Sequence, residues 1–379
     1  MNQKELKEIR RRFSLEKDSI SHIYGCYVNA AKEIVTKIDM SVGLMEQEEA
    51  EMYLKLLKKA ISGNLGRNLL DIPFSVAQVE GSDEHRLLQA LRTSHLKDEN
   101  MRDLMYDRII ESLDMGEDSY VILMAADSYD VPFKGGDDEI FDEGSNEVFD
   151  YIVCGIYPVK DAKAALRYES EEKAFRSAST GHVIGTPQIG FMFPAFDGRC
   201  ANIYNALYYS RDILEIHDEF IKGIFNVEEV PMSAGAQINA FGGVLEEALG
   251  SDCKLEVIQA VHGEIREMLN IHKENKEIEL PEIYVEDVDD ILRKKGVPAE
   301  KIEAFNQACQ QQMGGSGVFN PANLIETKKF EMATSEVKIT VEPDFAGSIQ
   351  TKEIDGIQYI LVPVGEGVLV NGIDISVEE

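Results

Sequence analysis

The sequence is poor in basic residues and has no long apolar run. Its 379 residues include 38 Lys and Arg against 69 Asp and Glu, a formal charge of −31, and 44% of them are hydrophobic. A surface of that sign repels phosphate backbones and anionic lipids, which bind through local clusters of Lys and Arg. No apolar run approaches the roughly 18 to 20 residues of a membrane-spanning helix. The composition therefore predicts a globular protein without general affinity for nucleic acid or membranes.

The motifs of several common enzyme classes are also missing. The five cysteines contain no C-x-x-C pair and the seven histidines form no H-E-x-x-H motif, so the usual zinc spacings are absent. There is no P-loop, no G-x-S-x-G elbow and no convincing G-x-G-x-x-G after a strand, which argues against those nucleotide and hydrolase sites. Scattered cysteines fit reduced, mostly buried thiols, and residues 1–5 lack the apolar core of a signal peptide. We therefore expect a cytoplasmic protein.

The apolar pattern of the first half predicts strands and helices together. Tyr120–Ala126 is continuously apolar between Asp118 and Asp127, as in a strand that is buried on both faces and central in a sheet. Residues 20–38 alternate on either side of 29–32, which predicts a hairpin.

Helices are expected where apolar residues recur at three and four positions. The pattern predicts helices at 45–61, 84–91 and 99–113, with Ser82 and Asp98 as N-caps of the last two. After the turn at Asp197 and Gly198, the chain is expected to run into a helix that passes Ile221.

The second half changes character twice. Residues 254–272, 285–295 and 298–313 are periodic helices, and from residue 330 the period becomes two, with hairpin turns at Asp355-Gly356 and Asn371-Gly372. The predicted fold class is α+β, with a mixed sheet and helices in the first part. The expected domains are an α+β body at 1–230, a helical segment at 231–315, and a linker with a β-rich unit at 316–379.

The first seventeen residues are the only conspicuously basic stretch. They hold six Lys and Arg, including Arg10, Arg11 and Arg12, against three Glu, a local charge of +3. A helix over 3–13 either docks on the protein's own acidic surface, lies in solvent, or contacts an acidic partner or RNA. Glu8 precedes Arg11 and Arg12 by three and four positions, so pairing within the helix favours the first two interpretations.

Carboxylates that follow the apolar strand raise the question of a metal. Hard cations prefer oxygen ligands, and open sheets bind ligands at the carboxyl ends of their strands. Asp127 and Asp130 equally suit an Asx turn ahead of the acidic loop 130–147, which has seven carboxylates against Lys134. We favour the turn and expect no cofactor; Mg²⁺ or Ca²⁺ at Asp127 and Asp130 is the alternative.

Residues 191–212 combine six Phe and Tyr with two Arg, two Asn and two Asp. Aromatic rings beside Arg and Asn are typical of binding surfaces, because they bury area at low entropic cost. Three interpretations stay open: core and turn, a binding surface, or an active site. The candidate binding residues are Asp197, Arg199, Asn202, Tyr204, Asn205, Tyr208 and Arg211.

Six short segments occur in a specific order along the chain: EIRRRF at 8–13, GCYVN at 25–29, EHRLL at 84–88, YDVPF at 129–133, FPAFDGR at 193–199 and NIYNALYY at 202–209. Together they resemble an uncharacterised family from anaerobic Gram-positive bacteria, catalogued as domain of unknown function 4317. The likeness covers nearly the whole chain. It implies a bacterial cytosolic setting and brings no activity, cofactor or catalytic residue with it.

Two classes of function fit these residues. The first is a non-enzymatic binding or regulatory protein that contacts a protein partner through segment 191–212. The second is a metal-assisted hydrolase or nucleotide-processing enzyme, in which Asp127, Asp130 and Asp197 hold the metal and Arg199 pairs with phosphate. The second class requires these four side chains to share one pocket. Neither class specifies an oligomeric state.

Overall fold

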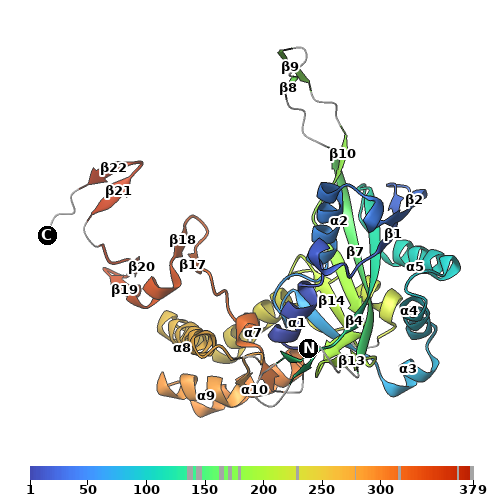
Figure 1. Cartoon of the computed structure of the whole chain (residues 1–379). Coiled ribbons are helices and arrows are strands. Elements are labelled where there is room, and N and C mark those ends of the chain that lie inside the picture. Colours follow the sequence, from blue (N-terminus) through green and yellow to red (C-terminus); the bar gives the residue numbers. More distant parts are fainter. Residues whose placement is uncertain are drawn as a thin grey trace. The chain divides into compact units, whose positions relative to one another are not determined.

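The protein is seen here as a computed structural model (Figure 1), in which the chain divides into two compact units, Met1–Ser233 and Ala234–Glu379. The structure describes residues 1–134, 140–141, 147–161, 166–169, 173–177, 181–227, 230–277, 279–314, 317–364 and 367–375. Apart from residues 231–233, the expected segments 231–315 and 316–379 both fall in the second unit.

A large antiparallel sheet forms the centre of the first unit, and the α+β fold class is confirmed. The order across the sheet is β2 (Ile34–Ser41), β1 (His22–Val28), β4 (Tyr120–Asp130), β7 (Val148–Asp161), β11 (Ile189–Phe193), β14 (Asn205–Ser210) and β3 (Leu69–Pro73). A short strand, β10 (His182–Ile184), pairs with the far end of β7.

Strand β4 shows how the sheet separates two hydrophobic cores. Its side chains point alternately to the two faces, so Ile122 and Met124 join one core while Leu123 and Ala125 join the other. The strand is central, between β1 and β7, as its apolar run predicts.

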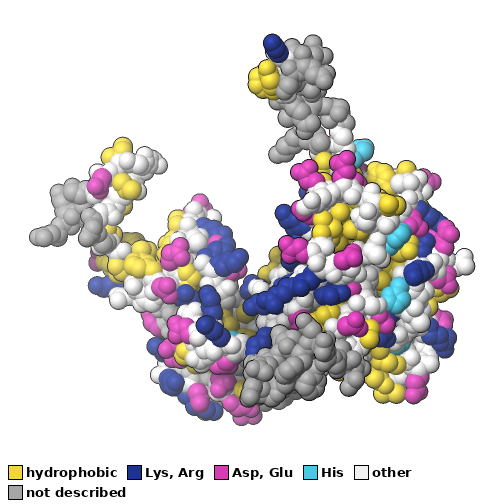
Figure 2. Space-filling model, in the orientation of Figure 1, with side chains coloured by type: hydrophobic (Ala, Val, Ile, Leu, Met, Phe, Trp, Pro, Cys, Tyr) yellow, Lys and Arg dark blue, Asp and Glu magenta, His cyan; other side chains and the backbone are white. Residues whose placement is uncertain are grey.

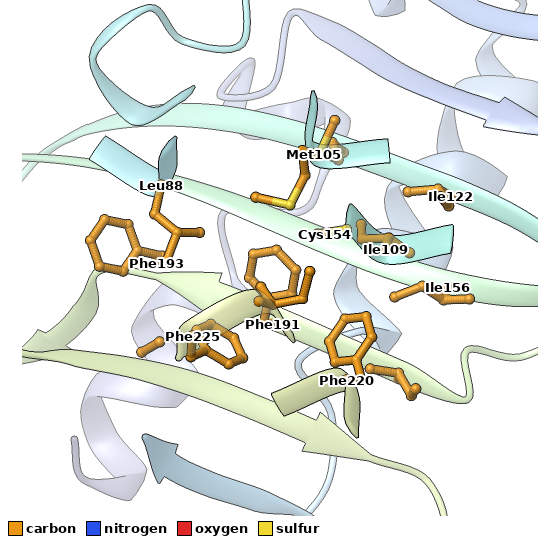
Figure 3. Packing of buried hydrophobic residues seen from close by; sticks show 14 of the residues in the cluster. Leu88, Met105, Ile109, Ile122, Cys154, Ile156, Phe191, Phe193, Phe220 and Phe225 are labelled. Carbon is orange, nitrogen blue, oxygen red and sulfur yellow. The ribbon is translucent and has the colours of Figure 1, made fainter. Parts of the chain in front are cut away.

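Helices cover both faces of this sheet. The first core packs against α4 (Asp83–Thr93), α5 (Glu99–Ser112) and α6 (Asp218–Phe225), and Figure 3 shows Leu88, Met105 and Phe220 from these helices around Phe191. The second core packs against α1 (Gln3–Arg10) and α2 (Gln47–Lys59). A short helix, α3 (Val76–Gly81), precedes α4.

Most of the expected elements of the first unit are confirmed. Strands β1 and β2 form the predicted hairpin, α2 occupies the predicted helix at 45–61, and the side chains of Ser82 and Asp98 accept hydrogen bonds from the first turns of α4 and α5. Strand β3 at the edge of the sheet was not predicted from the sequence.

Two expectations were wrong. Asp127 to Asp130 is not a turn, because β4 continues to Asp130 and pairs there with the start of β7. The helix expected after Gly198 passes Ile221 as predicted, but it begins only at Asp218, as α6, so Leu214 lies outside it and residues 200–210 form β13 (Cys200–Asn202) and β14 instead. In both places strand pairing across the sheet overrides the local pattern.

The second unit has its own hydrophobic core between four helices. These are α7 (Ala234–Leu249), α8 (Leu255–Glu274), α9 (Val285–Lys294) and α10 (Ala299–Gln312). The predicted hairpin of helices is confirmed, and Gly296 has a φ of +79° at the end of α9. His262 of α8 lies half-buried with its ring edge-on to Phe330, and burial lowers its pKa to about 4.

Three hairpins follow the helices, as the period-two pattern predicts. They are β17 (Phe330–Ala333) with β18 (Lys338–Val341), β19 (Gln350–Ile354) with β20 (Ile357–Leu361), and β21 (Val368–Val370) with β22 (Ile373–Ile375). Asp355-Gly356 and Asn371-Gly372 all have positive φ, which is the geometry of type I′ turns.

The remaining elements are short. They are β5 (Phe133–Lys134), β6 (Ile140–Phe141), β8 (Leu166–Glu169), β9 (Ala174–Ser177), β12 (Ala195–Asp197), β15 (Ile283–Tyr284), β16 (Val318–Phe319) and the 3₁₀ turns at 15–17, 42–44, 250–252, 321–323 and 343–348. Most of the acidic loop expected at 130–147, namely 135–139 and 142–146, lies outside the described residues.

A pair of glycines lets α2 approach the sheet closely. Gly155 of β7 and Gly190 of β11 are opposite one another, and a Cβ on Gly190 would lie 2.2 Å from the carbonyl oxygen of Ala60.

We expect Gly190→Ala to lower the free energy of unfolding by about 1–3 kcal/mol, because backbone must shift to admit the methyl group. Urea denaturation followed by circular dichroism measures this. Gly81→Ala is the matched control, since a Cβ there meets nothing within 4 Å. Equal midpoints for the two variants would contradict the close packing.

Candidate functional site around the first helix

Helix α1 starts from a capping box and buries one side. The Asn2 side chain accepts from the amides of Lys4 and Glu5, and the Glu5 carboxylate accepts from the amide of Asn2. Leu6 and Ile9 are fully buried in the second core. The helix ends at Arg10, three residues earlier than expected, and the chain turns so that the next arginines leave the helix axis.

Arg12 contacts Asp127 in the second half of β4. Its Nε and Nη2 donate to the two carboxylate oxygens of Asp127, each at 2.8 Å, and the Tyr151 hydroxyl donates to Oδ2 at 2.9 Å. Asp127 is only 3% exposed. Bidentate geometry of this kind is the strongest pairing available to a carboxylate. Arg12 and Tyr151 thus occupy the oxygens that a metal would need.

The electrostatics of the pair follow from burial and charge. Burial lowers the pKa of Arg12, but the hydrogen bond and the charge of Asp127 outweigh it and raise that pKa overall. Burial, and then the charge of Asp127, raise the pKa of Tyr151 far above its ordinary value. Arg12 and Tyr151 therefore stay protonated at any physiological pH.

A second cluster joins the same helix to Arg199. The Arg199 Nη1 lies 2.7 Å from Glu8 Oε2, its Nη2 donates to the carbonyl of Pro132 at 2.8 Å, and its amide donates to Glu5 at 3.2 Å. The Tyr129 hydroxyl donates to the other oxygen of Glu8 at 2.6 Å.

The two clusters touch at Tyr129. The guanidinium carbon of Arg12 lies 4.7 Å from the centre of the Tyr129 ring, a cation–π contact. The basic segment is thus held by contacts with the protein's own body, as the docking interpretation predicts.

The structure disperses the other residues of segment 191–212. Asp197 accepts from the Asn202 amide at 3.3 Å and lies 3.4 Å from the amine of Met1. Tyr204 is exposed, Arg211 is exposed, and Asn205 is half-buried.

Tyr208, by contrast, is fully buried in the first core and donates its hydroxyl to the carbonyl of Ile216 at 2.7 Å. It has no exposed surface to offer a partner. Phe191, Phe193 and Phe196 are also fully buried, so most of the aromatic content of the segment is core.

The structure gives the four residues of the enzyme hypothesis separate partners and surroundings. Asp127 and Arg199 are paired with groups from the basic segment, Asp197 contacts Asn202, and Asp130 is exposed at the end of β4. Among the described residues, no group of three His, Cys, Asp or Glu is arranged to hold a metal ion.

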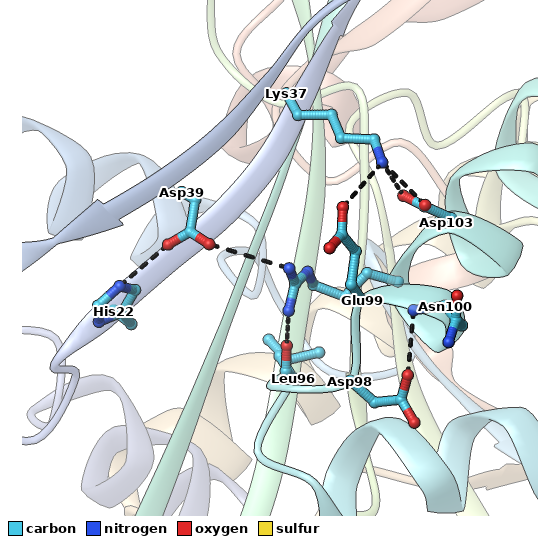
Figure 4. A network of polar contacts seen from close by, with 9 residues as sticks. His22, Lys37, Asp39, Leu96, Asp98, Glu99, Asn100 and Asp103 are labelled. Atoms are coloured by element: carbon cyan, nitrogen blue, oxygen red, sulfur yellow. Dashed lines mark hydrogen bonds and ion pairs between the residues drawn. The ribbon is translucent and has the colours of Figure 1, made fainter.

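An open pocket of about 420 Å³ lies beside Asp127, and the sequence did not point to it. Two histidines line it. His22 Nε2 lies 3.1 Å from Asp39 (Figure 4), and the other carboxylate oxygen of Asp39 lies 3.9 Å from Arg102. His95 Nε2 lies 3.8 Å from Asp150. His95 comes from the turn between α4 and α5 and has a φ of +50°. These histidines lie far apart in sequence, so spacing alone gave no signal for them.

A family model for a domain of unknown function (DUF4317) matches residues 1–373. The chain belongs to this family. No curated protein matches it. In the part of the chain that the structure describes, no helix is both long and apolar enough to cross a bilayer.

We expect Arg12→Ala to lower the free energy of unfolding by about 3–5 kcal/mol, because it leaves Asp127 buried without its counter-ion. Chemical denaturation measures the loss. Arg11→Ala is the control, since Arg11 is exposed and its side chain makes no hydrogen bond or ion pair with the described residues. A loss no greater than that of the control would mean that Arg12 and Asp127 are not a buried pair in solution.

Two tyrosines of the candidate surface are expected to respond differently. Tyr208→Ala should lower the free energy of unfolding by about 3–5 kcal/mol, because it leaves a cavity in the core. Tyr204→Ala should leave the free energy of unfolding within about 0.5 kcal/mol of wild type, since its ring lies at the surface. Thermal unfolding of both variants tests this; similar losses would place Tyr204 in the core as well.

Proposed function

We propose that this protein is a cytoplasmic, non-enzymatic binding protein whose partner is another protein, in the bacterial setting that the resemblance implies. The observation that carries the proposal is the outward-facing apolar side of its C-terminal hairpins.

The hairpin of β19 and β20 has one apolar face, and that face lies in solvent. Register places Ile354 opposite Ile357, with Tyr359 and Leu361 further along the same face. Their exposed fractions are 41%, 58%, 42% and 36%. Gln350 and Lys352 lie on this face too, and the opposite face carries Thr351, Glu353, Gln358 and the half-buried Ile360. Four apolar side chains in solvent are the reverse of a surface hairpin that packs its apolar side inward.

The hairpin of β21 and β22 also exposes apolar side chains, with Leu369 73% exposed on one face and the other face formed by apolar residues. Val370 and Ile373 are directly opposite one another and 46% and 68% exposed, and Ile375 lies on the same face. By comparison, β17 and β18 keep Phe330 buried. A two-stranded hairpin alone is marginally stable in water, so exposed apolar faces on two successive hairpins are typical of surfaces completed by a partner.

The partner's chemistry follows from charge and from the free strand edges. Residues 350–375 contain one Lys and four acidic residues, a charge of −3. Within the described residues each strand of the two hairpins pairs with one neighbour only, so the other edge can accept a strand. The matching partner is an extended protein segment that alternates apolar side chains with Lys or Arg.

The internal pairing of the candidate catalytic residues supports a non-enzymatic role. Asp127 and Arg199 are neutralised by Arg12 and Glu8, and a carboxylate in a bidentate pair is a poor metal ligand or general base. From segment 191–212, Asn202, Tyr204, Asn205 and Arg211 retain some exposure and would add a second contact area in the first unit.

The experiment is a selection of random twelve-residue peptides displayed on phage against the full chain. We expect the selected peptides to alternate apolar and basic residues, and Ile357→Ser/Tyr359→Ser to weaken their binding at least tenfold, since two exposed contacts are removed. Fluorescence anisotropy with a synthetic peptide measures the affinity.

Leu44→Ser/Val76→Ser is the matched control, because both side chains are exposed in the first unit, at 89% and 59%. Equal weakening by the two double variants, or peptides without basic residues, would contradict the proposal. Sedimentation that shows a dimer abolished by Ile357→Ser/Tyr359→Ser would instead identify a second copy of the chain as the occupant.

A further inference from the structure

A pocket of about 780 Å³ in the first unit has a basic wall, although the protein as a whole is strongly acidic. It lies between the end of α1, the residues that follow it, and the outer side of α2. Figure 2 shows Lys and Arg side chains gathered over α1 and the adjoining part of α2.

The three lysines of this pocket have no side-chain partners among the described residues. Lys55, Lys58 and Lys59 follow one another at the three- and four-residue spacing that places them along one side of α2. Within the described residues none of the three makes an ion pair or a side-chain hydrogen bond. In a chain with 69 carboxylates, three neighbouring lysines without a carboxylate partner are unexpected.

Arg10 completes the wall from α1. Its Nε and Nη2 donate to the carbonyls of Ile61 and Gly63, at 3.0, 2.7 and 3.0 Å, and so satisfy the end of α2. This offsets the negative pole of that helix, which would otherwise repel an anion. The remaining Nη1 has no hydrogen bond to the described residues and is free to donate.

Charge and size together define the ligand class. Four cations line the pocket against Glu16 and Glu51, which leaves a charge of 4 − 2 = +2. A phosphate monoester carries about −1.5 to −2 at neutral pH. The volume is in the range of small-molecule pockets, and Phe13 and Leu54 give it an apolar floor.

We infer that this pocket binds a phosphate-bearing small molecule with an apolar part. The phosphate contacts Lys55, Lys58 and the free Nη1 of Arg10, and the apolar part lies against Phe13 and Leu54. The site belongs to the first unit and does not depend on the hairpins of the proposed function.

The test uses phenyl phosphate as the probe and isothermal titration calorimetry with the full chain. We expect measurable binding at low ionic strength, and at least a tenfold weaker affinity in Lys55→Gln/Lys58→Gln, because two charge-assisted hydrogen bonds are lost. Both lysines are exposed and unpaired, so this variant should keep the wild-type unfolding midpoint.

Lys294→Gln/Lys295→Gln is the matched control, with the same change in net charge at two exposed lysines of the second unit. It should bind phenyl phosphate as wild type does. Benzoate, which has the ring but one charge, should bind more weakly than phenyl phosphate.

Three outcomes would overturn the inference. They are no binding of phenyl phosphate to the wild-type chain at millimolar concentration, equal weakening in the two double variants, and benzoate binding as tightly as phenyl phosphate. Displacement of phenyl phosphate by a polyglutamate peptide at a lower concentration than by inorganic phosphate would also overturn it, since the site would then recognise an acidic peptide.

Discussion

The first unit is organised around one buried charge. Asp127 is buried in the second half of the central strand, where an ionised carboxylate without a partner would cost several kcal/mol. Arg12 supplies the counter-charge and Tyr151 a further hydrogen bond. To bring Arg12 there, α1 must end at Arg10 and lie on the sheet, which places Leu6 and Ile9 in the second core and Glu8 within reach of Arg199. The position of the first helix therefore follows from the need to neutralise one carboxylate.

The same pairing changes how the charge of the protein is interpreted. Two cations of the basic leading segment are paired internally, because Arg10 and Arg12 have partners inside the first unit, and Glu8 of the same segment pairs with Arg199. Three lysines that have no partner among the described residues, Lys55, Lys58 and Lys59, lie instead on α2, a helix whose composition is not conspicuously basic because it also carries three glutamates in its first half. Net charge alone could not separate these two cases, since it does not record which groups face each other.

Local patterns predicted the fold well wherever the element is decided by its own residues. The N-caps Ser82 and Asp98, the Asp-Gly and Asn-Gly turns, and the apolar run of β4 all lie where expected, because each depends on contacts within a few residues. The expectations that were wrong concern residues whose structure depends on strand pairing across the sheet. The local sequence of Asp127 to Asp130 predicts a turn, but these residues extend a strand. Tyr208 was expected at the surface, but it is buried in the first core together with residues of the neighbouring strands and of α6. The two histidines beside Asp127 gave no signal, since only the packing of β1 against the α4–α5 turn brings them to one pocket.

The sequence by itself determined the fold class, the central strand, the order of helices and hairpins, and the absence of common nucleotide and hydrolase motifs. These depend on periodicity, caps and turn residues, which act over one or two turns of chain. Only the tertiary structure decided which charged side chains are paired inside the protein. It joined Arg12 to Asp127 across 115 positions and Arg199 to Glu8 across 191, and it left Lys55 and Lys58 unpaired. Charge pairing depends on distance in space, and local sequence patterns do not reveal that distance. The residues that pair come together only when the sheet forms.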